Sequence, residues 1–318
     1  MQPQLPVSVF RLDYQLDDSP SLPAYAGSTW RGAFGQALKR TVCVARDTVC
    51  AECMLYRSCV YPYIFETPPP PDTTKMRHYT AAPHPFVLTM EPSQTALSYR
   101  LGLTLLGRAQ QYLPYVIHAL AKAGEQGLGK KRQPFMLKAV QQATNADLSS
   151  WEDIYQVGQP LMPRPGSQPV LQPLPASVGI EIQTPLRLRR NEQHVTPEAF
   201  RFADLFGSLL RRISLLTYFH TDTPLETDFA GLTQRARSVR LIEPVLRWRD
   251  WTRYSSRQQT TLEMGGIVGR FQLDGAEIAE FWPYLWLGQW THAGKAATMG
   301  LGRYRIVAAS LPQDTAHT

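Results

Sequence analysis

A short pattern, Gly-Leu-Gly followed by basic residues, occurs twice in this chain at matching places. The first copy spans residues 127–129 and continues with Lys130-Lys131-Arg132; the second spans residues 300–302 and continues with Arg303. Each copy follows a helical segment and precedes a strand-like one. A helix C-cap accounts for one glycine in each copy, but for neither the second glycine nor the basic flank. The recurrence therefore indicates two copies of one supersecondary unit.

The periodicity of the apolar residues gives the same element order in both halves. In the first half it predicts strands at 7–16, 86–90, 97–106 and 135–140 and helices at 27–42 and 109–123, with Ser28 as a possible N-cap. In the second half it predicts strands at 178–188, 239–254, 261–273 and 299–307 and helices at 197–219 and 276–290. This order, βαββαβ twice, predicts an α+β chain of two tandem ferredoxin-like (RRM-like) domains.

The proline-rich stretch at 160–176 is typical of a linker, so we expect domains at 1–160 and 177–311. The length of 318 residues fits two domains, and 43% hydrophobic residues are enough for a sizeable core. No apolar run reaches the roughly 20 residues of a membrane span. The N-terminus lacks the features of a secretory signal, so we expect a cytoplasmic protein without a membrane partner.

The formal charge is +7, and 26 of the 33 basic residues are arginine. Arginine offers a planar fork that matches phosphate and stacks on bases, so this bias is typical of a protein that binds nucleic acid. An arginine-rich codon bias is an equally good explanation of the charge alone.

All four cysteines, Cys43, Cys50, Cys53 and Cys59, fall within 17 residues after the first predicted helix. Four thiolates at this spacing can close a tetrahedral zinc site, and a reducing compartment disfavours disulfides. We expect a structural Zn²⁺ that holds a four-cysteine insertion at 43–60. An iron–sulfur cluster and four unligated thiols are the alternatives.

Several blocks give the chain a resemblance to a known family. They are residues 27–35 (GSTWRGAFG), the cysteine cluster with residues 61–66 (YPYIFE), residues 83–88 (PHPFVL), residues 264–269 (MGGIVG), and the segments 287–295 and 300–304. In this order they resemble the RAMP-superfamily CRISPR endoribonucleases that process precursor crRNA, the Cas-six family, in the branch with a distinctive C-terminal domain. The resemblance implies binding of CRISPR repeat RNA and metal-independent cleavage that leaves a 2′,3′-cyclic phosphate. Other CRISPR-associated proteins of an effector complex are possible further partners.

The residues available for proton transfer differ from the pattern of the family. Many family members carry a histidine in or just after the first helix, where this chain has Arg31, Lys39 and Arg40. His292 lies close to the second Gly-Leu-Gly and to Lys295, and an imidazole there suits proton transfer. The expected catalytic residues are His292, Lys295 and Arg31, with Arg31 stabilising the phosphorane. We interpret His84, His118 and His220 as structural.

Further basic and aromatic residues are expected to contact RNA. In the segment 240–257 arginines are interleaved with aromatic residues, a pattern suited to phosphate contact and base stacking. The alternative is an exposed strand with Trp248 in the core. The expected RNA-binding residues are Lys39, Lys130, Lys131, Arg132, Arg247, Arg249, Trp251, Arg253, Tyr254, Arg257, Gly300, Gly302 and Arg303.

The sequence thus predicts a crRNA-processing endoribonuclease. A RAMP subunit that binds crRNA without cleaving it is the first alternative, supported by the missing histidine. A metal- or redox-sensing regulator that binds DNA is a more distant one, and the sequence contains no helix-turn-helix to support it.

Overall fold

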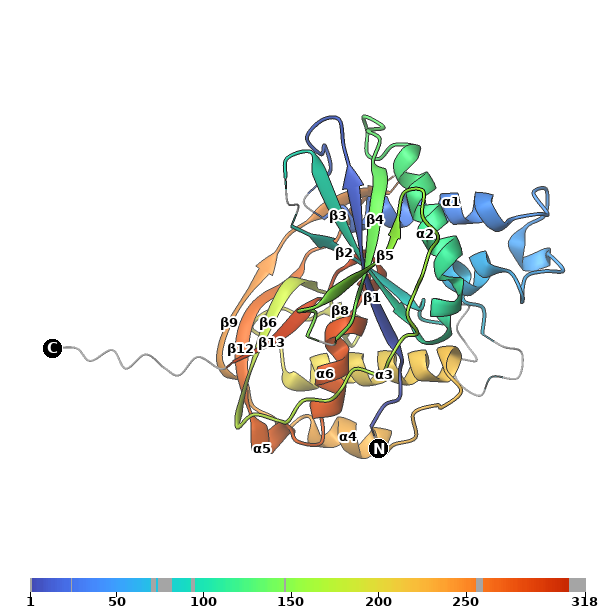
Figure 1. Cartoon of the computed structure of the whole chain (residues 1–318). Coiled ribbons are helices and arrows are strands. Elements are labelled where there is room, and N and C mark those ends of the chain that lie inside the picture. Colours follow the sequence, from blue (N-terminus) through green and yellow to red (C-terminus); the bar gives the residue numbers. More distant parts are fainter. Residues whose placement is uncertain are drawn as a thin grey trace.

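The computed structural model describes residues 2–23, 25–69, 73, 82–92, 95–145, 147–255 and 260–308, with backbone alone at 253–255 and 260–262. Two antiparallel sheets with helices packed against them form the molecule (Figure 1). No helix in these ranges is long and apolar enough to cross a membrane. The expected Arg257 lies outside the described residues.

The first unit contains a five-stranded sheet with the order β2-β3-β1-β4-β5. Its elements are β1 (Val7–Gln15), α1 (Gly27–Val42), β2 (Phe86–Glu91), β3 (Ser98–Leu106), α2 (Leu113–Glu125), β4 (Met136–Ala143) and β5 (Trp151–Gln156). Helix α1 buries Trp30, Phe34 and Leu38, whose spacing of four residues places them on one face of the helix. This face packs into the core of the first unit.

The second unit contains a four-stranded sheet with the order β13-β6-β12-β9. Its main elements are β6 (Ser177–Leu186), α3 (Phe202–His220), α4 (Phe229–Arg235), β9 (Ile242–Arg249), β12 (Gly266–Asp274), α5 (Gly275–Ile278), α6 (Trp282–Thr291) and β13 (Tyr304–Ala308). Two short hairpins, β7–β8 (Arg189–Arg190 and Gln193–His194) and β10–β11 (Thr252–Ser255 and Thr260–Glu263), extend from it.

Both sheets have the same order when the four strands of each unit are counted along the chain. The first and third strands are central, the fourth lies beside the first, and the second lies beside the third. This is the order of a ferredoxin-like βαββαβ unit, and β5 extends the first sheet. The prediction of an α+β fold with two tandem ferredoxin-like units is therefore confirmed.

One predicted N-cap and several predicted boundaries are wrong for local reasons. Helix α1 begins at Gly27 after Ala26 as N-cap, so Ser28 does not cap it. Helix α3 begins at Phe202 because the Asp204 carboxylate accepts from the backbone N–H of Arg201 at 2.9 Å. The single helix expected at 276–290 is two helices, and Pro283 lies in the first turn of the second, where a missing N–H is tolerated. Strand β5 was not predicted.

The two Gly-Leu-Gly segments adopt the same conformation. Gly127 and Gly129 have φ of +81° and +71°, and Gly300 and Gly302 have φ of +86° and +68°. The leucine between each pair of glycines is buried, at 2% and 1% exposure. Both glycines of each copy therefore occupy the left-handed region that a side chain disfavours, which explains why a simple helix C-cap could not account for the pattern.

The segment at 160–176 is tied to the first unit. Ser167 pairs with Val7 in an isolated β-bridge, and the side-chain amide of Gln142 both donates to and accepts from the backbone of Arg164. Gln168 accepts from the backbone N–H of Leu5 at 2.6 Å. The connection between the units is therefore ordered and is held by hydrogen bonds to the first unit.

Candidate functional site

The N-terminal end of α1 lies against the second glycine-rich segment. Gly27 approaches the carbonyl group of Met299 so closely that a β-carbon on it would overlap that group. Gly300 approaches β2, where a β-carbon would lie 2.6 Å from the carbonyl oxygen of Leu88. The hydroxyl of Thr184 donates to the carbonyl oxygen of Gly300 at 2.7 Å and fixes the loop to β6. Elements of both units therefore meet at this loop.

Arg31 of α1 and His84, just before β2, form a hydrogen-bonded chain beside this junction. Arg31 Nη2 donates to His84 Nε2 at 3.1 Å. The hydroxyl of Thr67 donates to the carbonyl oxygen of Ala82 at 2.6 Å, so it accepts from His84 Nδ1–H at 3.0 Å. Burial, reinforced by the charge of Arg31, lowers the pKa of His84 to about 3. The imidazole is neutral and its orientation is fixed.

His84 was interpreted as structural from the sequence, and its contact with Arg31 was not foreseen. The available signal was its place in residues 83–88, one of the blocks that carry the family resemblance. The structure thus brings one expected catalytic residue, Arg31, together with a histidine that was expected only to pack.

His292 follows the last residue of α6 and is 2% exposed. Its Nδ1 donates to the carbonyl oxygen of Leu301 at 3.2 Å, within the glycine-rich segment. Burial, and to a lesser extent the charge of Arg303, lowers the pKa of His292 to about 3. In this conformation the imidazole has almost no surface through which RNA could reach it. Its catalytic role stays a prediction.

Lys295 is exposed and lies in a cluster of basic groups from the second unit. Its backbone N–H donates to the carbonyl oxygen of Arg187 at 3.0 Å, and Arg187 Nη2 lies 3.4 Å from His194 Nε2. Partial burial, together with the charges of Arg189 and Arg187, lowers the pKa of Lys295. The same arginines contribute to lowering the pKa of His194, after burial. A bound anion would stabilise each of these mutually repelling cations.

Strand β9 carries the predicted alternation. Arg247 and Arg249 are exposed, whereas Trp248 is partly buried and packs against the core. Arg247 and Arg249 also line a groove of about 530 Å³ on the face formed by β6, β12 and β9, together with Arg270. The interpretation as RNA-contacting residues and the alternative of an exposed strand with a packed tryptophan are thus both compatible with the geometry.

The chain beyond β9 reaches the first unit. The rings of Trp251 and Tyr25 lie 5.0 Å apart, and the guanidinium of Arg249 lies 5.3 Å from the Tyr25 ring. Tyr25 lies two residues before the start of α1, so these residues approach the junction of the units. The backbones of Arg253 and Tyr254 lie in β10, but their side chains lie outside the described part of the structure.

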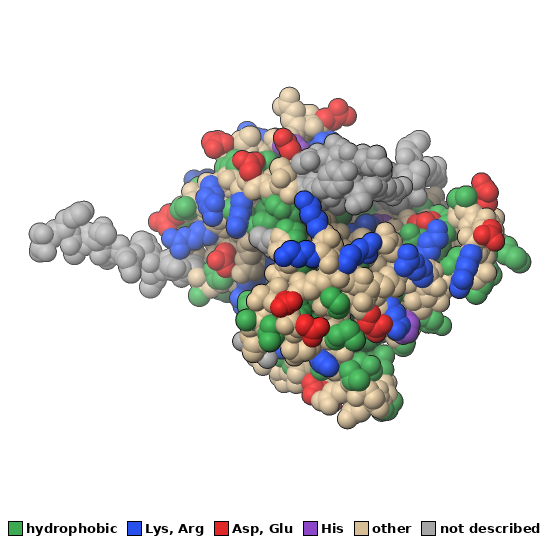
Figure 2. All heavy atoms as spheres, turned by 90° about the horizontal axis from the view of Figure 1, so that it is seen from above, with side chains coloured by type: hydrophobic (Ala, Val, Ile, Leu, Met, Phe, Trp, Pro, Cys, Tyr) green, Lys and Arg blue, Asp and Glu red, His purple; other side chains and the backbone are tan. Residues whose placement is uncertain are grey.

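The first glycine-rich segment presents Lys130, Lys131 and Arg132 to solvent. The side chain of Gln133 donates to the carbonyl oxygens of Asp18 and Ser19, at 2.8 and 3.1 Å, which ties this loop to the connection between β1 and α1. Figure 2 looks down on the end of the molecule that is uppermost in Figure 1 and shows a row of Lys and Arg side chains across it. The basic loops of both units are thus linked through the segment that precedes α1.

The other expected RNA contacts differ in exposure. Lys39 is exposed on α1, with Nζ 5.6 Å from the ring of Tyr61. Arg303 is partly buried, and its backbone N–H donates to the hydroxyl of Thr184 at 2.9 Å. Gly300 and Gly302 are buried, so they shape the loop from within. His118, expected to be packed, is exposed on α2.

The four cysteines lie in the segment that follows α1 and projects to the right in Figure 1. All four are free thiols of intermediate exposure. Among the described residues no group of three or more His, Cys, Asp or Glu side chains is placed to hold a metal ion. The zinc site predicted from the spacing therefore has no support in this structure.

These features define the class of the protein. Two ferredoxin-like units meet at a glycine-rich loop beside basic side chains, which is the arrangement expected of a RAMP protein. Two family models match the chain in succession: "AF_1859_N: N-terminal domain" over residues 5–166 and "CRISPR-associated endoribonuclease Cas6" over residues 180–304. The first spans half of the chain, and the second spans most of the rest. The chain belongs to the family of the first model, and its second half matches the CRISPR-associated endoribonuclease Cas6 family.

Solved structures with the same fold cover almost the whole chain. A Cas6 product complex has a TM-score of 0.58 at 18% identity, and the alignment covers 95% of this chain and 99% of the chain in that structure. For Thermus thermophilus Cas6 the TM-score is 0.54 at 16% identity, and the alignment covers 96% of this chain and 99% of the other. For a partial Cas6-RT-Cas1–Cas2 complex the TM-score is 0.52 at 13% identity, and the alignment covers 96% of this chain but 47% of the other. No curated protein matches the chain significantly.

Proposed function

We propose that this protein cleaves CRISPR precursor RNA within its repeats to release crRNA. The observation that carries the proposal is the meeting of α1, the start of β2 and the glycine-rich segment at one place, where Gly27 and Gly300 make the contacts between units. The family match supports RNA cleavage, and the product complex among the similar structures supports the same substrate class for this chain.

The proposed reaction is an internal transesterification. A ribose 2′-oxygen attacks the adjacent phosphorus, the bond from phosphorus to the 5′-oxygen of the next nucleotide breaks, and a base takes the 2′-proton while the leaving oxygen gains one. The products are a 2′,3′-cyclic phosphate and a 5′-hydroxyl, and neither water nor a redox partner is consumed. Cationic side chains stabilise the pentavalent phosphorane, so the proposed route requires no metal ion.

The geometry favours Arg31 and His84 at the centre of this chemistry. Arg31 supplies a guanidinium for the phosphorane, and His84 Nε2 is a lone-pair acceptor held at 3.1 Å from it. An RNA phosphate near His84 would raise the pKa of its imidazole from the low value that burial imposes, because a negative charge favours the protonated form. Lys295 is an exposed cation that precedes the second glycine-rich segment.

The test is incubation of the purified protein with repeat RNA in the presence of EDTA. We expect one specific cut, a 3′ fragment with a 5′-hydroxyl and a 5′ fragment with a cyclic phosphate, both identified by mass spectrometry. A single 2′-deoxy nucleotide at the cut should abolish cleavage without abolishing binding. Tight binding with no cut would instead favour the alternative of a crRNA-binding subunit without nuclease activity.

The same assay separates the two candidate histidines. Removing a general acid or base slows cleavage by about 10²- to 10⁴-fold. His84→Ala should show such a loss at unchanged RNA affinity. His292→Gln should retain the rate, because glutamine can still donate to the carbonyl oxygen of Leu301. The reverse pattern would assign proton transfer to His292 as the sequence predicted.

We also propose that other CRISPR-associated proteins are partners of this chain. The similar structure of a partial Cas6-RT-Cas1–Cas2 complex supports testing proteins encoded beside the same repeat array.

A further inference from the structure

Arg212 of α3 is a partly buried cation that has no counter-ion among the described residues. Its Nε donates to the carbonyl oxygen of Thr291 at 2.7 Å, but its Nη2 is shielded from solvent and has no hydrogen-bond partner. No carboxylate in the described part of the chain forms an ion pair with it. Burial lowers the pKa of Arg212 to about 10, so the side chain is still charged at neutral pH. Buried charges are normally paired, and this one is not.

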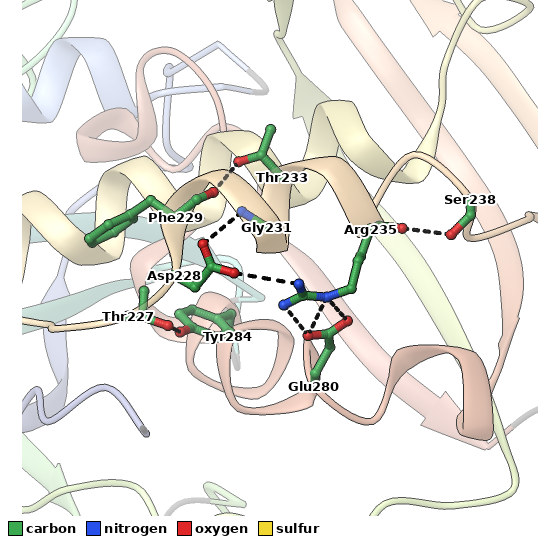
Figure 3. A network of polar contacts seen from close by, with 9 residues as sticks. All are labelled: Thr227, Asp228, Phe229, Gly231, Thr233, Arg235, Ser238, Glu280 and Tyr284. Carbon is green, nitrogen blue, oxygen red and sulfur yellow. Dashed lines mark hydrogen bonds and ion pairs between the residues drawn. The ribbon is translucent and has the colours of Figure 1, made fainter.

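Arg235, in the same unit, shows what a fully paired arginine looks like (Figure 3). Its Nε and Nη2 donate to the carboxylate of Glu280 at 2.7–2.9 Å, and its Nη1 lies 3.5 Å from Asp228 Oδ2. Arg235 is nearly half exposed, where pairing contributes little. In the described parts of the chain, carboxylates thus pair with the more exposed Arg235, whereas none pairs with Arg212.

The groups around Arg212 are neutral imidazoles from three elements. Its charge is among the causes that lower the pKa values of His84, His220 and His292. His220 Nε2 donates to the carbonyl oxygen of Pro83 at 2.8 Å, so its Nδ1 accepts from the hydroxyl of Tyr63 at 3.1 Å. His84 and His292 are likewise oriented by the contacts described above. The other charges that act on these three rings are those of Arg31, Arg108 and Arg303, and that of His220 on His84.

We propose that Arg212, together with Arg31, forms an anion-binding centre that takes one phosphate of the RNA backbone at the junction of the two units. Arg31 comes from α1 and Arg212 from α3, and His84 lies near both. A phosphodiester oxygen would give the free Nη2 an acceptor and the buried charge a counter-ion. The centre rests on the proposed function, because its ligand is the RNA that the protein processes.

The proposal separates binding of this phosphate from the chemistry of cleavage. The guanidinium of Arg212 is too basic to exchange protons at neutral pH, so its part is to position the strand. RNA affinity is therefore the primary measurement, and cleavage is secondary. A purely packing role for Arg212 would instead appear in the stability of the protein without RNA.

The experiment compares Arg212→Met with Arg235→Met as the matched control. The Kd for repeat RNA with one 2′-deoxy nucleotide at the mapped cut is measured at several salt concentrations; if the protein makes no cut, unmodified RNA is used. Arg212→Met should weaken binding by about 10- to 100-fold, as expected for a charge-assisted hydrogen bond. It should also reduce the slope of log K against log[salt] by about 0.7 to 0.9, the contribution of one phosphate. Arg235→Met should change neither quantity.

Two further measurements guard against misfolding and against a different ligand. Thermal unfolding without RNA should show Arg212→Met to be at least as stable as the natural protein, since the substitution removes an unpaired buried charge. If Arg212→Met does not fold, Arg212→Lys takes its place, with the same loss of affinity expected because the planar fork is gone. Thermal unfolding is also compared in inorganic phosphate and in sodium chloride at equal ionic strength. The comparison shows whether free phosphate stabilises the natural protein against unfolding through Arg212.

Unchanged RNA affinity and an unchanged salt slope in a folded Arg212 variant would overturn the proposal. Protection by inorganic phosphate through Arg212 without any effect on RNA binding would overturn it too, because the centre would then serve free phosphate. If the natural protein binds RNA without cutting it and Arg212→Met still weakens binding, the anion-binding centre stands and the nuclease assignment falls.

Discussion

Residues His220 and His292 are each 2% exposed and each donates a hydrogen bond to a backbone carbonyl. Burial lowers their pKa values from 6.5 to about 4 and about 3. Between pH 6.5 and about 4 the unfolded chain therefore binds more protons than the folded chain. The contribution of these histidines to the free energy of unfolding is complete above pH 6.5. It falls as the pH drops, by up to about 1.4 kcal/mol per pH unit for each histidine.

His292→Gln should make the free energy of unfolding less dependent on pH in this window, because one of the depressed pKa values is removed. Urea unfolding at pH 7 and pH 5 measures the difference. His118→Gln, the same substitution at an exposed position of α2, is the matched control. A dependence in His292→Gln equal to that of the natural protein would show that its imidazole is not held neutral by burial.

At the residue scale the sequence identified chemically suitable side chains but not their surroundings. Arg31 was expected in the site and does contact a histidine there. That histidine, His84, was expected only to pack, and Arg212 was not singled out at all. Periodicity tells which face of an element is apolar, but the partners of a polar side chain come from segments distant in the sequence, as the contact between α1 and the start of β2 shows.

Among the elements, the glycine-rich segment between α6 and β13 depends most on backbone conformation. Gly302 has φ of +68°, and a β-carbon on it would overlap the carbonyl oxygen of Ala293. Gly302→Ala should destabilise the protein by about 1–3 kcal/mol, because alanine disfavours this conformation and the neighbouring backbone must move. Chemical denaturation of the purified variant measures the loss.

Gly207→Ala provides the matched control for this substitution. Gly207 lies inside α3, with nothing within 4 Å of the position of a β-carbon. Alanine there should stabilise the protein by about 0.5–1 kcal/mol, because it restricts the unfolded chain and favours the helix. Equal effects of the two substitutions would mean that the left-handed conformation of the loop is not required.

The elements most readily predicted from the sequence were those with long, regular apolar patterns. The expected bounds of α1, 27–42, agree with the structure because its apolar face repeats without interruption. Strand β5 was missed because it adds to an existing sheet at an edge, where little of it is buried. The hairpin β10–β11 was read as part of two long strands, because the sequence shows no clear sign of where each turns away from the main sheet.

The whole molecule combines two copies of one topology, and one of its two cores contains residues from both copies. The copies were predictable because their glycine-rich segments repeat in the sequence, but their contact was not, because it depends on single close approaches such as that of Gly300 to Leu88. Leu5, Val7 and Leu106 of the first unit are buried in the core that otherwise belongs to the second. The two units should therefore unfold together.

We expect the intact chain to unfold in one cooperative urea transition, with circular dichroism and tryptophan fluorescence changing together. Both units contribute to the fluorescence, through Trp30 in the first and Trp282 in the second. Leu106→Ala should lower the midpoint by removing about 2–5 kcal/mol of stability without splitting the transition, because Leu106 is 0% exposed and, although it belongs to β3 of the first unit, lies in the core of the second. Leu120→Ala, in the core of the first unit alone, is the control for a cavity of the same size. Two separate transitions in the natural chain, or a split that only Leu106→Ala produces, would show that the units are coupled too weakly to hold a shared site in place.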